Sequence, residues 1–319
     1  MEIVLIDGLS FALPLFLIAI GGIYSERSGI TNLALEGLLG FGAFSGALVV
    51  VLTADLFPSN SQLPFYIALL FSCLGGMVYS MLHALLCVKF KANQVISGVV
   101  INILAVALTS FLTSQFNSMF FGTPSSQFVL GVSNRFTVPV VSKIPILGAI
   151  FKDVYPFEAI ILLIAVIAWY VLYQTPYGMR LRACGENPHA VDAAGADVSK
   201  IRFSAVMFSG AFSGIGGICF AYSISANFSS SIYAGFGYLA IAALIFGNWK
   251  ILPTFGACLL FGFARSGGYE ISKLLKLSSS FSDLIMILPY VLTLLLLIFF
   301  SKNNRVPKAL GEIYDKSKR

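Results

Sequence analysis

Long apolar runs separated by short polar breaks dominate this sequence, and they limit how such a chain can fold. Hydrophobic residues make up 58% of the 319 residues, and charged residues make up only 11%. A soluble domain carries about a quarter charged residues, because its surface faces water. This chain has too little charge to coat a globule of its size. We therefore expect a surface that faces lipid.

The apolar runs predict about nine membrane-spanning helices, between eight and ten, since each crossing needs roughly 20 residues. The chain is thus expected to be an all-α polytopic membrane protein, with residues 1–319 forming a single transmembrane domain. The expected spans are 3–23, 30–53, 63–87, 94–114, 157–173, 203–224, 234–247, 252–268 and 283–301.

Two of these segments look interrupted. The segment 234–247 is too short to cross a core of about 30 Å as a straight helix that rises 1.5 Å per residue. The segment 30–53 begins in the polar stretch 28–32 and holds Glu36 well inside. Broken helices are tolerated in membranes where other helices surround them. We expect one or both segments to be broken.

The basic residues predict an orientation. If the loop 174–202 is cytoplasmic, fourteen of the twenty Lys and Arg residues fall on its side of the membrane. Cytoplasmic loops carry an excess of Lys and Arg. The expected topology has the N-terminus outside, an extracytoplasmic loop at 115–156, and a cytoplasmic tail at 302–319.

The chain carries no recognisable machinery for hydrolysing ATP or for binding a metal. No GxxxxGK[ST] sequence occurs, so a phosphate-binding loop is not expected. The five cysteines are scattered without a CxxC pair, and there are only two histidines. No arrangement typical of nucleophilic catalysis stands out. We expect no enzymatic activity, no metal site and no cofactor in this chain.

The loop 174–202 contains a compact helix signal. Asn187 followed by Pro188 is typical of a helix start, with Asn as the cap and Pro at the first helical position. The helix would run from His189 to Ala194 and end at Gly195. Such a helix suits docking into a groove of another protein. The alternative is a solvated connector with positive charge at the membrane edge.

Several motifs resemble permease subunits of ABC importers. RACGENPHAVDAAG at 182–195 looks like the signature loop of the ribose, branched-chain amino acid and nucleoside permeases. ERSGITNLALEG at 26–37 is similar to a motif of the nucleoside and simple-sugar importers. The stretch 93–98 with Asn102, and the stretch 235–247, fit the same group. The resemblance covers roughly residues 10–300.

This resemblance implies a type II importer-like permease bundle in the bacterial inner membrane that pairs with a sister permease. A partner ATP-binding subunit would bind ATP and Mg²⁺, and an extracytoplasmic solute-binding protein or lipoprotein would deliver a nucleoside or simple sugar. No nucleic acid polymer is implied. The residues expected to couple the permease to the ATPase are Glu186, Asn187, Pro188, His189, Asp192, Ala193, Ala194 and Gly195.

Three residues inside the spans are candidates for the substrate pathway. Glu36 is an ionisable group within a span, which marks a functional site by default; structurally, it would cap a helix or pair with Arg27. Asn102 would bind a hydroxylated solute or form a helix–helix hydrogen bond. Phe111 lies nine positions after Asn102, about two and a half turns further along the helix, and is interpreted as lying on the same face.

Two other classes of function remain alternatives. An ion-coupled secondary transporter of a small polar solute would also use broken helices near the membrane midplane. Glu36 stands alone, however, where ion coupling would favour paired carboxylates. A membrane-embedded enzyme would need a cluster of catalytic groups at one depth, and the sequence indicates none.

Overall fold

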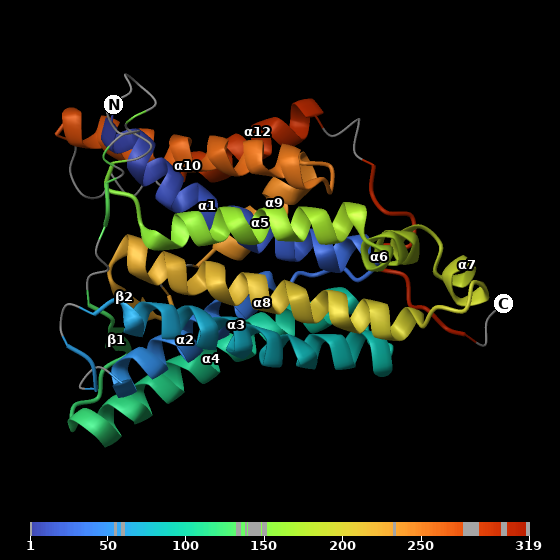
Figure 1. The fold of residues 1–319 in the computed structure, drawn as a ribbon, viewed down its shortest axis with the longest axis horizontal. Coiled ribbons are helices and arrows are strands. Elements are labelled where there is room, and N and C mark those ends of the chain that lie inside the picture. The colour runs from blue at the N-terminus through green and yellow to red at the C-terminus, as the bar shows by residue number, and fades with distance from the viewer. Residues whose placement is uncertain are drawn as a thin grey trace.

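The computed structural model describes residues 2–53, 56–58, 61–131, 135–137, 139, 148, 152–231, 234–276, 287–300 and 305–316. The described chain is almost entirely helical, and its long helices run roughly along one axis (Figure 1). The N-terminus lies at one end of this bundle, and the C-terminus lies at the other end beside the short helix α7 (Figure 1).

The helices of the first half are α1 (Glu2–Arg27), α2 (Leu35–Thr53), α3 (Leu63–Ala84), the one-turn π-helix η2 (Leu85–Lys89) and α4 (Gln94–Phe121). Those of the second half are α5 (Pro156–Gln174), α6 (Pro176–Glu186), α7 (Pro188–Ala193), α8 (Val198–Ile224), α9 (Phe236–Phe246), α10 (Ile251–Leu274) and α12 (Leu288–Phe300).

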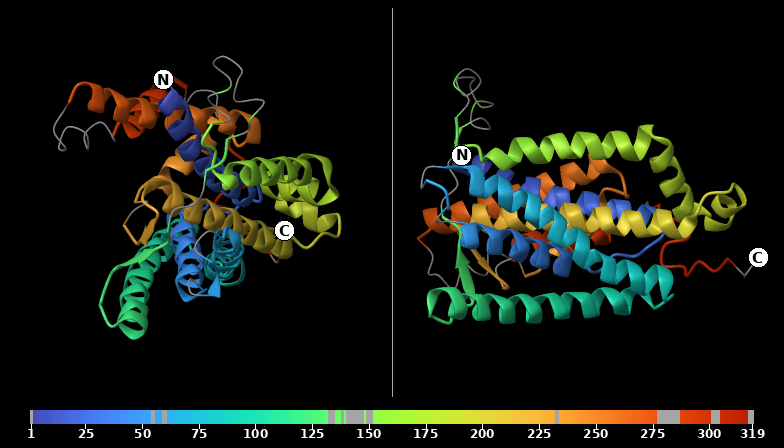
Figure 2. Two further views of the ribbon diagram at one scale, coloured as in Figure 1. Left: turned by 60° about the vertical axis from the view of Figure 1, so that its left-hand side comes forward. Right: turned by 60° about the horizontal axis from the view of Figure 1, so that its bottom comes forward.

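The centre of the bundle is formed by α1, α2, α3 and α8, whereas α4 and α5 lie on its outside (Figure 2). Glycines allow the central helices to approach closely. A Cβ added at Gly42 of α2 would overlap the Cα of Gly214 in α8, and one at Gly76 of α3 would overlap the carbonyl of Gly210. Small residues at helix contacts are typical of packing within lipid.

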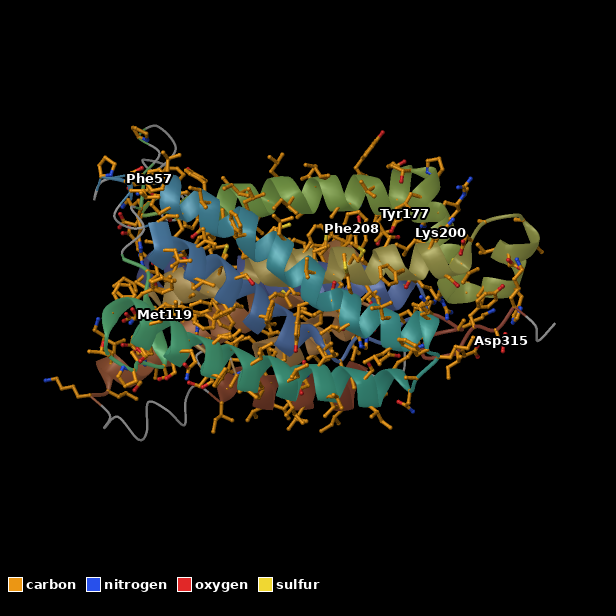
Figure 3. All side chains as sticks on the ribbon, turned by 90° about the horizontal axis from the view of Figure 1, so that it is seen from below. Phe57, Met119, Tyr177, Lys200, Phe208 and Asp315 are labelled. Carbon is orange, nitrogen blue, oxygen red and sulfur yellow. The ribbon has the colours of Figure 1, made fainter. Side chains whose placement is uncertain are left out.

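Two short strands close the end of the bundle opposite α7. Strand β1 (Gln127–Val129) pairs antiparallel with β2 (Asn227–Ser229). Phe128 and Phe228 are partners in this register, and both are buried against Phe44 of α2. Figure 3 shows Met119 near this end, and Lys200 and Asp315 at the end that carries α7.

Among the described residues, six helices are long and apolar enough to cross a membrane, fewer than the nine that the sequence predicts. They are α1, α2, α3 with η2, α4, α5 and α8. Helix α9 has only 11 residues, and the described part of α12 has 13. Helix α10 is long enough but carries Arg265, Glu270 and Lys273. The polytopic membrane architecture stands; the count of nine spans does not follow from the helices.

The helix ends also differ from the sequence boundaries. Helix α4 continues to Phe121, inside the predicted loop 115–156, and α8 begins at Val198, inside the predicted loop 174–202. Helix α2 begins only at Leu35, and residues 28–34 run as non-helical chain. Helix α9 is likewise preceded by a turn at Ala234 and Gly235. In both segments that the sequence marks as interrupted, 30–53 and 234–247, the helix begins only after non-helical residues.

Candidate functional site

The starts of α2 and α9 meet inside the bundle and form what we call the break site: Glu36, Asn102, Gly235, Gly237 and Tyr238. Glu36 accepts hydrogen bonds from the backbone N–H of Gly235 and, at 2.6 Å, of Gly237. The first N–H groups of a helix have no partner within the helix, and its N-terminus attracts negative charge. The Glu36 carboxylate therefore caps α9.

Glycine is required on the α9 side of this contact. Gly235 has a φ of +94°, a conformation that glycine adopts without steric cost. A Cβ added at Gly237 would overlap the backbone nitrogen of Glu36. Helix capping is one of the two structural roles that the sequence predicts for Glu36, and α9 is the helix that it caps.

Asn102 uses its side chain to hold three segments together. Its Oδ1 accepts from the backbone N–H of Gly37 at 2.7 Å. Its Nδ2 donates to the carbonyl of Leu33 at 2.8 Å and to the Tyr238 hydroxyl at 3.1 Å. Asn102 thus joins α4 to the break before α2 and to α9. These are helix–helix hydrogen bonds, the structural alternative considered for this residue.

Phe111 does not share a face with Asn102, so this part of the sequence interpretation was wrong. At 3.6 residues per turn, nine positions make two and a half turns, and the half turn places the two residues on opposite sides of the helix. The exposed fraction of Asn102 is 6%, whereas that of Phe111 is 60%. Phe111 lies on the outer face of α4, away from the break site.

The non-helical segment 28–34 is held by polar side chains from neighbouring helices. The backbone N–H of Thr31 donates to Gln94 Oε1 at 2.7 Å, and the Thr31 carbonyl lies 3.2 Å from His83 Nε2. Asn32 Nδ2 donates to Ser209 Oγ at 2.8 Å. Irregular backbone at membrane depth needs such partners because lipid offers none. His83 and Tyr238 were missed by the sequence analysis, because nothing local marks their distant partners.

A second candidate region is the coupling surface, which we define as α6, α7 and the chain segment 305–316. Helix α7 forms as the sequence predicts. Asn187 Oδ1 accepts from the Ala190 N–H at 3.0 Å, Pro188 occupies the first turn, and Gly195 ends the helix with a φ of +81°. Of the eight predicted coupling residues, Pro188 is buried and Asp192 is half-buried; the exposed ones are Glu186, Asn187, His189, Ala193, Ala194 and Gly195.

The segment 305–316 lies against this surface, which the sequence analysis did not anticipate. The Ala309 N–H donates to the carbonyl of Gly185 at 2.8 Å, and the Gly311 N–H donates to that of Gly29 at 3.1 Å. Arg202 donates to the Ser28 carbonyl at 3.0 Å and to the Glu312 carbonyl at 2.9 Å. The tail thereby ties α6 and α8 to the turn after α1.

Side chains of the tail also reach α7. Lys316 lies 3.3 Å from the Asp192 carboxylate, and the ring of Tyr314 lies 5.3 Å from that of His189. On the other side of the tail, Asp315 pairs with Lys91 at 3.0 Å. Two predicted coupling residues, His189 and Asp192, are thus in contact with the tail. Helix α7 therefore packs against the segment 305–316.

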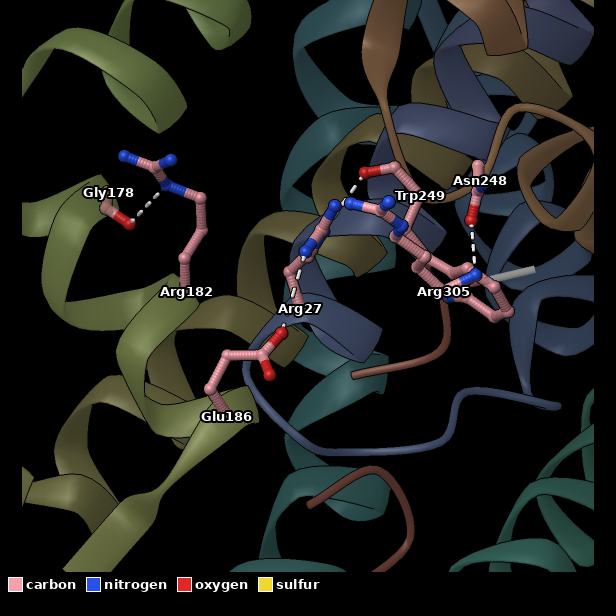
Figure 4. A network of polar contacts seen from close by, with 7 residues as sticks. All are labelled: Arg27, Gly178, Arg182, Glu186, Asn248, Trp249 and Arg305. Atoms are coloured by element: carbon pink, nitrogen blue, oxygen red, sulfur yellow. Dashed lines mark hydrogen bonds and ion pairs between the residues drawn. The ribbon is translucent and has the colours of Figure 1, made fainter. Parts of the chain in front are cut away.

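A network of polar contacts links the coupling surface to the turn between α9 and α10 (Figure 4). Arg27, at the end of α1, lies 3.9 Å from the Glu186 carboxylate and donates from Nε to the carbonyl of Trp249 at 3.0 Å. The neighbouring Asn248 accepts from the Arg305 N–H at 2.6 Å. The same turn follows α9, whose other end is capped by Glu36.

Two groups in this region show how their surroundings set their chemistry. Burial raises the pKa of the Cys184 thiol to about 11, so Cys184 stays protonated and acts as a small packing residue in α6. Asp197 accepts from the Lys200 N–H at 3.0 Å, and this hydrogen bond holds the pKa of Asp197 below its usual value. Asp197 is therefore an ionised cap at the start of α8.

Residues 4–298 match the family described as the branched-chain amino acid transport system permease component. The guanosine ABC transporter permease protein NupQ of Bacillus subtilis strain 168 is 38% identical over 313 residues, 98% of this chain and 96% of that protein. The nucleoside ABC transporter permease protein NupC of Lactococcus lactis subsp. cremoris strain MG1363 is 38% identical over 324 residues, 100% and 98% of the two chains. A second Bacillus protein, the guanosine ABC transporter permease protein NupP, is 27% identical over 267 residues, 82% of this chain and 71% of that protein. No solved structure is a significant match.

Proposed function

This chain belongs to the branched-chain amino acid transport permease family, and we propose that it is the membrane-spanning permease subunit of an ABC importer for nucleosides. The observation that carries the substrate class is similarity along nearly the whole chain to permeases named for guanosine and for nucleosides. The break site and the coupling surface are consistent with transport, because one lies within the helix bundle and the other is exposed at its end.

The work of ATP hydrolysis would come from a separate subunit that binds ATP and Mg²⁺. Its docking point would be α7 with the flanking residues Glu186 and Gly195, since this capped helix projects from one end of the bundle (Figure 1). Movement of α7 would pass through Arg27 to the turn at Trp249, and through α9 to the break site at Glu36. Alternating access would then follow from a shift of α9 within the bundle.

The importer would contain two permeases and a solute-binding protein or lipoprotein. A pair of permeases is supported by the two guanosine permease proteins of one Bacillus strain, both similar to this chain. In the bacterial inner membrane, α7 and the C-terminus would face the cytoplasm and the N-terminus the outside. The positions of Arg27, Lys91 and Lys200 near the end that carries α7 support this orientation.

Reconstitution tests this proposal. Proteoliposomes that contain both permeases and the ATPase, supplied with the binding protein and with ATP on the ATPase side, should accumulate radiolabelled guanosine. Omission of ATP or of the ATPase should abolish guanosine uptake. Uptake of ribose and of glucose, measured in the same way, tests the substrate class. Guanosine uptake by the permease alone, driven by an ion gradient, would instead establish a secondary transporter. Uptake of a sugar without any nucleoside would overturn the substrate class.

A further inference from the structure

A cavity of about 430 Å³ lies beside the first turns of α1. Helix α1 begins at the end of the bundle opposite α7 (Figure 1). We call this cavity the outer cavity, and the residues used below are Asp7, Phe11, Arg135, Arg265, Ser266 and Tyr269. They come from the first turns of α1, from the chain after β1, and from the second half of α10. Its volume lies within the range of small-molecule sites in proteins, roughly 300–1,000 Å³.

The walls of this cavity carry charged and hydroxyl side chains. Arg265 lies within α10, nine residues before the helix ends at Leu274. Its guanidinium lies 4.3 Å from the centre of the Phe11 ring and 5.4 Å from that of Phe236. A charged side chain among the apolar helices of a membrane protein is costly and marks a functional site by default. The aromatic rings stabilise the positive charge of Arg265. They offer no oxygen or nitrogen acceptors, so its N–H groups still need hydrogen-bond partners.

The charged groups of the cavity retain capacity for a ligand. Within the described part of the chain, neither the Asp7 carboxylate nor the Arg265 guanidinium makes a hydrogen bond or an ion pair within 4.0 Å. Arg135, in contrast, donates to the Tyr155 hydroxyl at 2.7 Å and stacks on that ring at 4.4 Å. The Asp7 carboxylate and the Arg265 guanidinium therefore retain hydrogen-bonding capacity for a ligand. Arg135 keeps its positive charge, because its partner Tyr155 is neutral, so the lining does not favour a second cation.

The chemistry of these groups matches the two halves of a nucleoside. An arginine fork pairs with two acceptors on one edge of a planar base, as it does with guanine O6 and N7 in nucleic acids. A carboxylate accepts hydrogen bonds from sugar hydroxyls. The ring of Tyr269, whose exposed fraction is 55%, offers a flat surface for stacking. A simple sugar can also accept hydrogen bonds from the guanidinium, but it lacks the planar edge with two acceptors and the flat base that a nucleoside offers to Arg265 and Tyr269.

The position of the cavity connects it to the break site. Its inner wall, Phe11, packs on Phe236 of α9 with ring centres 5.1 Å apart. Phe236 directly follows Gly235, one of the two residues whose N–H groups bond to Glu36. A ligand in the outer cavity would therefore lie against the start of the helix that the break site holds.

We propose that the outer cavity binds a neutral nucleoside as it enters the importer, with Arg265 on the edge of the base and Asp7 on the ribose hydroxyls. This inference rests on the proposed function and adds to it a binding site and the roles of two residues. Phe11 and Phe236 separate this entry site from the break site.

Equilibrium binding of tritiated guanosine to the purified importer, without its solute-binding protein, tests the site. Arg265→Lys keeps the charge but loses the fork, and Asp7→Asn loses the carboxylate. Each should weaken guanosine binding about tenfold, since a hydrogen bond to a charged group is lost. Lys250→Gln, an exposed cation at the other end of α10, is the control and should bind like the wild type.

A second measurement uses only the wild-type importer, so its result does not depend on whether the variants fold. Photolysis of 8-azidoguanosine with the wild-type importer should label the peptides that contain Phe11 or Tyr269, and excess guanosine should prevent this labelling. Unchanged affinity in both variants, or protected labelling only at other positions, overturns the site while leaving nucleoside import intact. A wild-type importer that takes up no nucleoside overturns the proposed function, and this inference with it.

Discussion

The Arg27 guanidinium lies 3.9 Å from the Glu186 carboxylate, and this contact joins the end of α1 to the end of α6 beside the coupling helix (Figure 4). The same side chain donates to the Trp249 carbonyl at 3.0 Å. The ion pair involves the half-exposed Glu186, and such pairs contribute about 0–1 kcal/mol. The hydrogen bond from a charged donor contributes more, about 1.5–3 kcal/mol. The hydrogen bond from Arg27 to Trp249 should therefore contribute more free energy than the ion pair with Glu186.

This difference in strength predicts an order of effects. Arg27→Gln should reduce nucleoside-stimulated ATPase activity of the assembled importer severalfold, whereas Glu186→Gln should change it less than twofold. Uptake and ATPase activity measured on the same preparation report the coupling. Arg180→Gln, which removes an exposed cation from α6, the helix that carries Glu186, is the control. Equal losses from Arg27→Gln and Arg180→Gln would show that the Trp249 link does not transmit movement.

Gly195 should tolerate only residues that accept a positive φ. Its φ of +81° costs a residue with a Cβ roughly 1–2 kcal/mol, and Asn less than a β-branched residue. A Cβ added at Gly195 would have no other atom within 4 Å, so a clash contributes nothing. Gly195→Asn should retain most coupling and Gly195→Val should lose most of it, as measured by ATP hydrolysed per nucleoside imported. Similar behaviour of the two variants would argue against a role for this turn.

Glu36→Gln should impair transport more than assembly. Gln retains one acceptor oxygen, but its NH₂ group would face one of the N–H donors at the start of α9. An unsatisfied buried donor costs about 1–3 kcal/mol. We expect a lower melting temperature and a loss of uptake of at least tenfold, with the complex still intact on size-exclusion chromatography. Glu2→Gln, on an exposed carboxylate, is the control; normal uptake by Glu36→Gln would contradict the capping role.

Asn102→Ala should destabilise the bundle more than Tyr238→Phe. The first change removes all three hydrogen bonds of the Asn102 amide, and the second removes only the one to the Tyr238 hydroxyl. At about 1 kcal/mol for each bond, the two losses should be near 3 and 1 kcal/mol. Thermal unfolding of the detergent-solubilised permease gives the order. If Phe111→Ala, on the opposite face, has the largest effect, this picture of α4 is wrong.

Truncation of the tail should loosen the coupling surface. A chain that ends at residue 304 loses the contacts to Gly29, Gly185, Asp192 and Arg202, whereas a chain that ends at Lys316 keeps them. The longer chain is therefore the matched control. Co-purification with the ATPase should fall severalfold for the shorter chain and stay normal for the longer one. Equal co-purification of both would show that the tail does not position α7.

Local signals in the sequence are sufficient for part of this architecture. The apolar runs are long enough to cross a membrane. A soluble fold that buried them would need a charged surface, and the chain carries too few charged residues to form one. The helix α7 is equally predictable. Asn187 bonds to a backbone N–H three residues away, and Gly195 needs only its own conformational freedom. Such features depend on neighbours along the chain.

The tertiary structure decided the rest, because those contacts join distant residues. Glu36 meets Gly235 across 199 positions, so only the packing of α2 against α9 could show which of its possible roles it plays. The contact of the tail with α7 likewise joins Lys316 to Asp192, which lie far apart in the chain. The face of Phe111, in contrast, follows from helix geometry and its spacing from Asn102 alone. Hydrophobicity places helices in the membrane; their partners depend on how the small residues of α2, α3 and α8 allow them to pack.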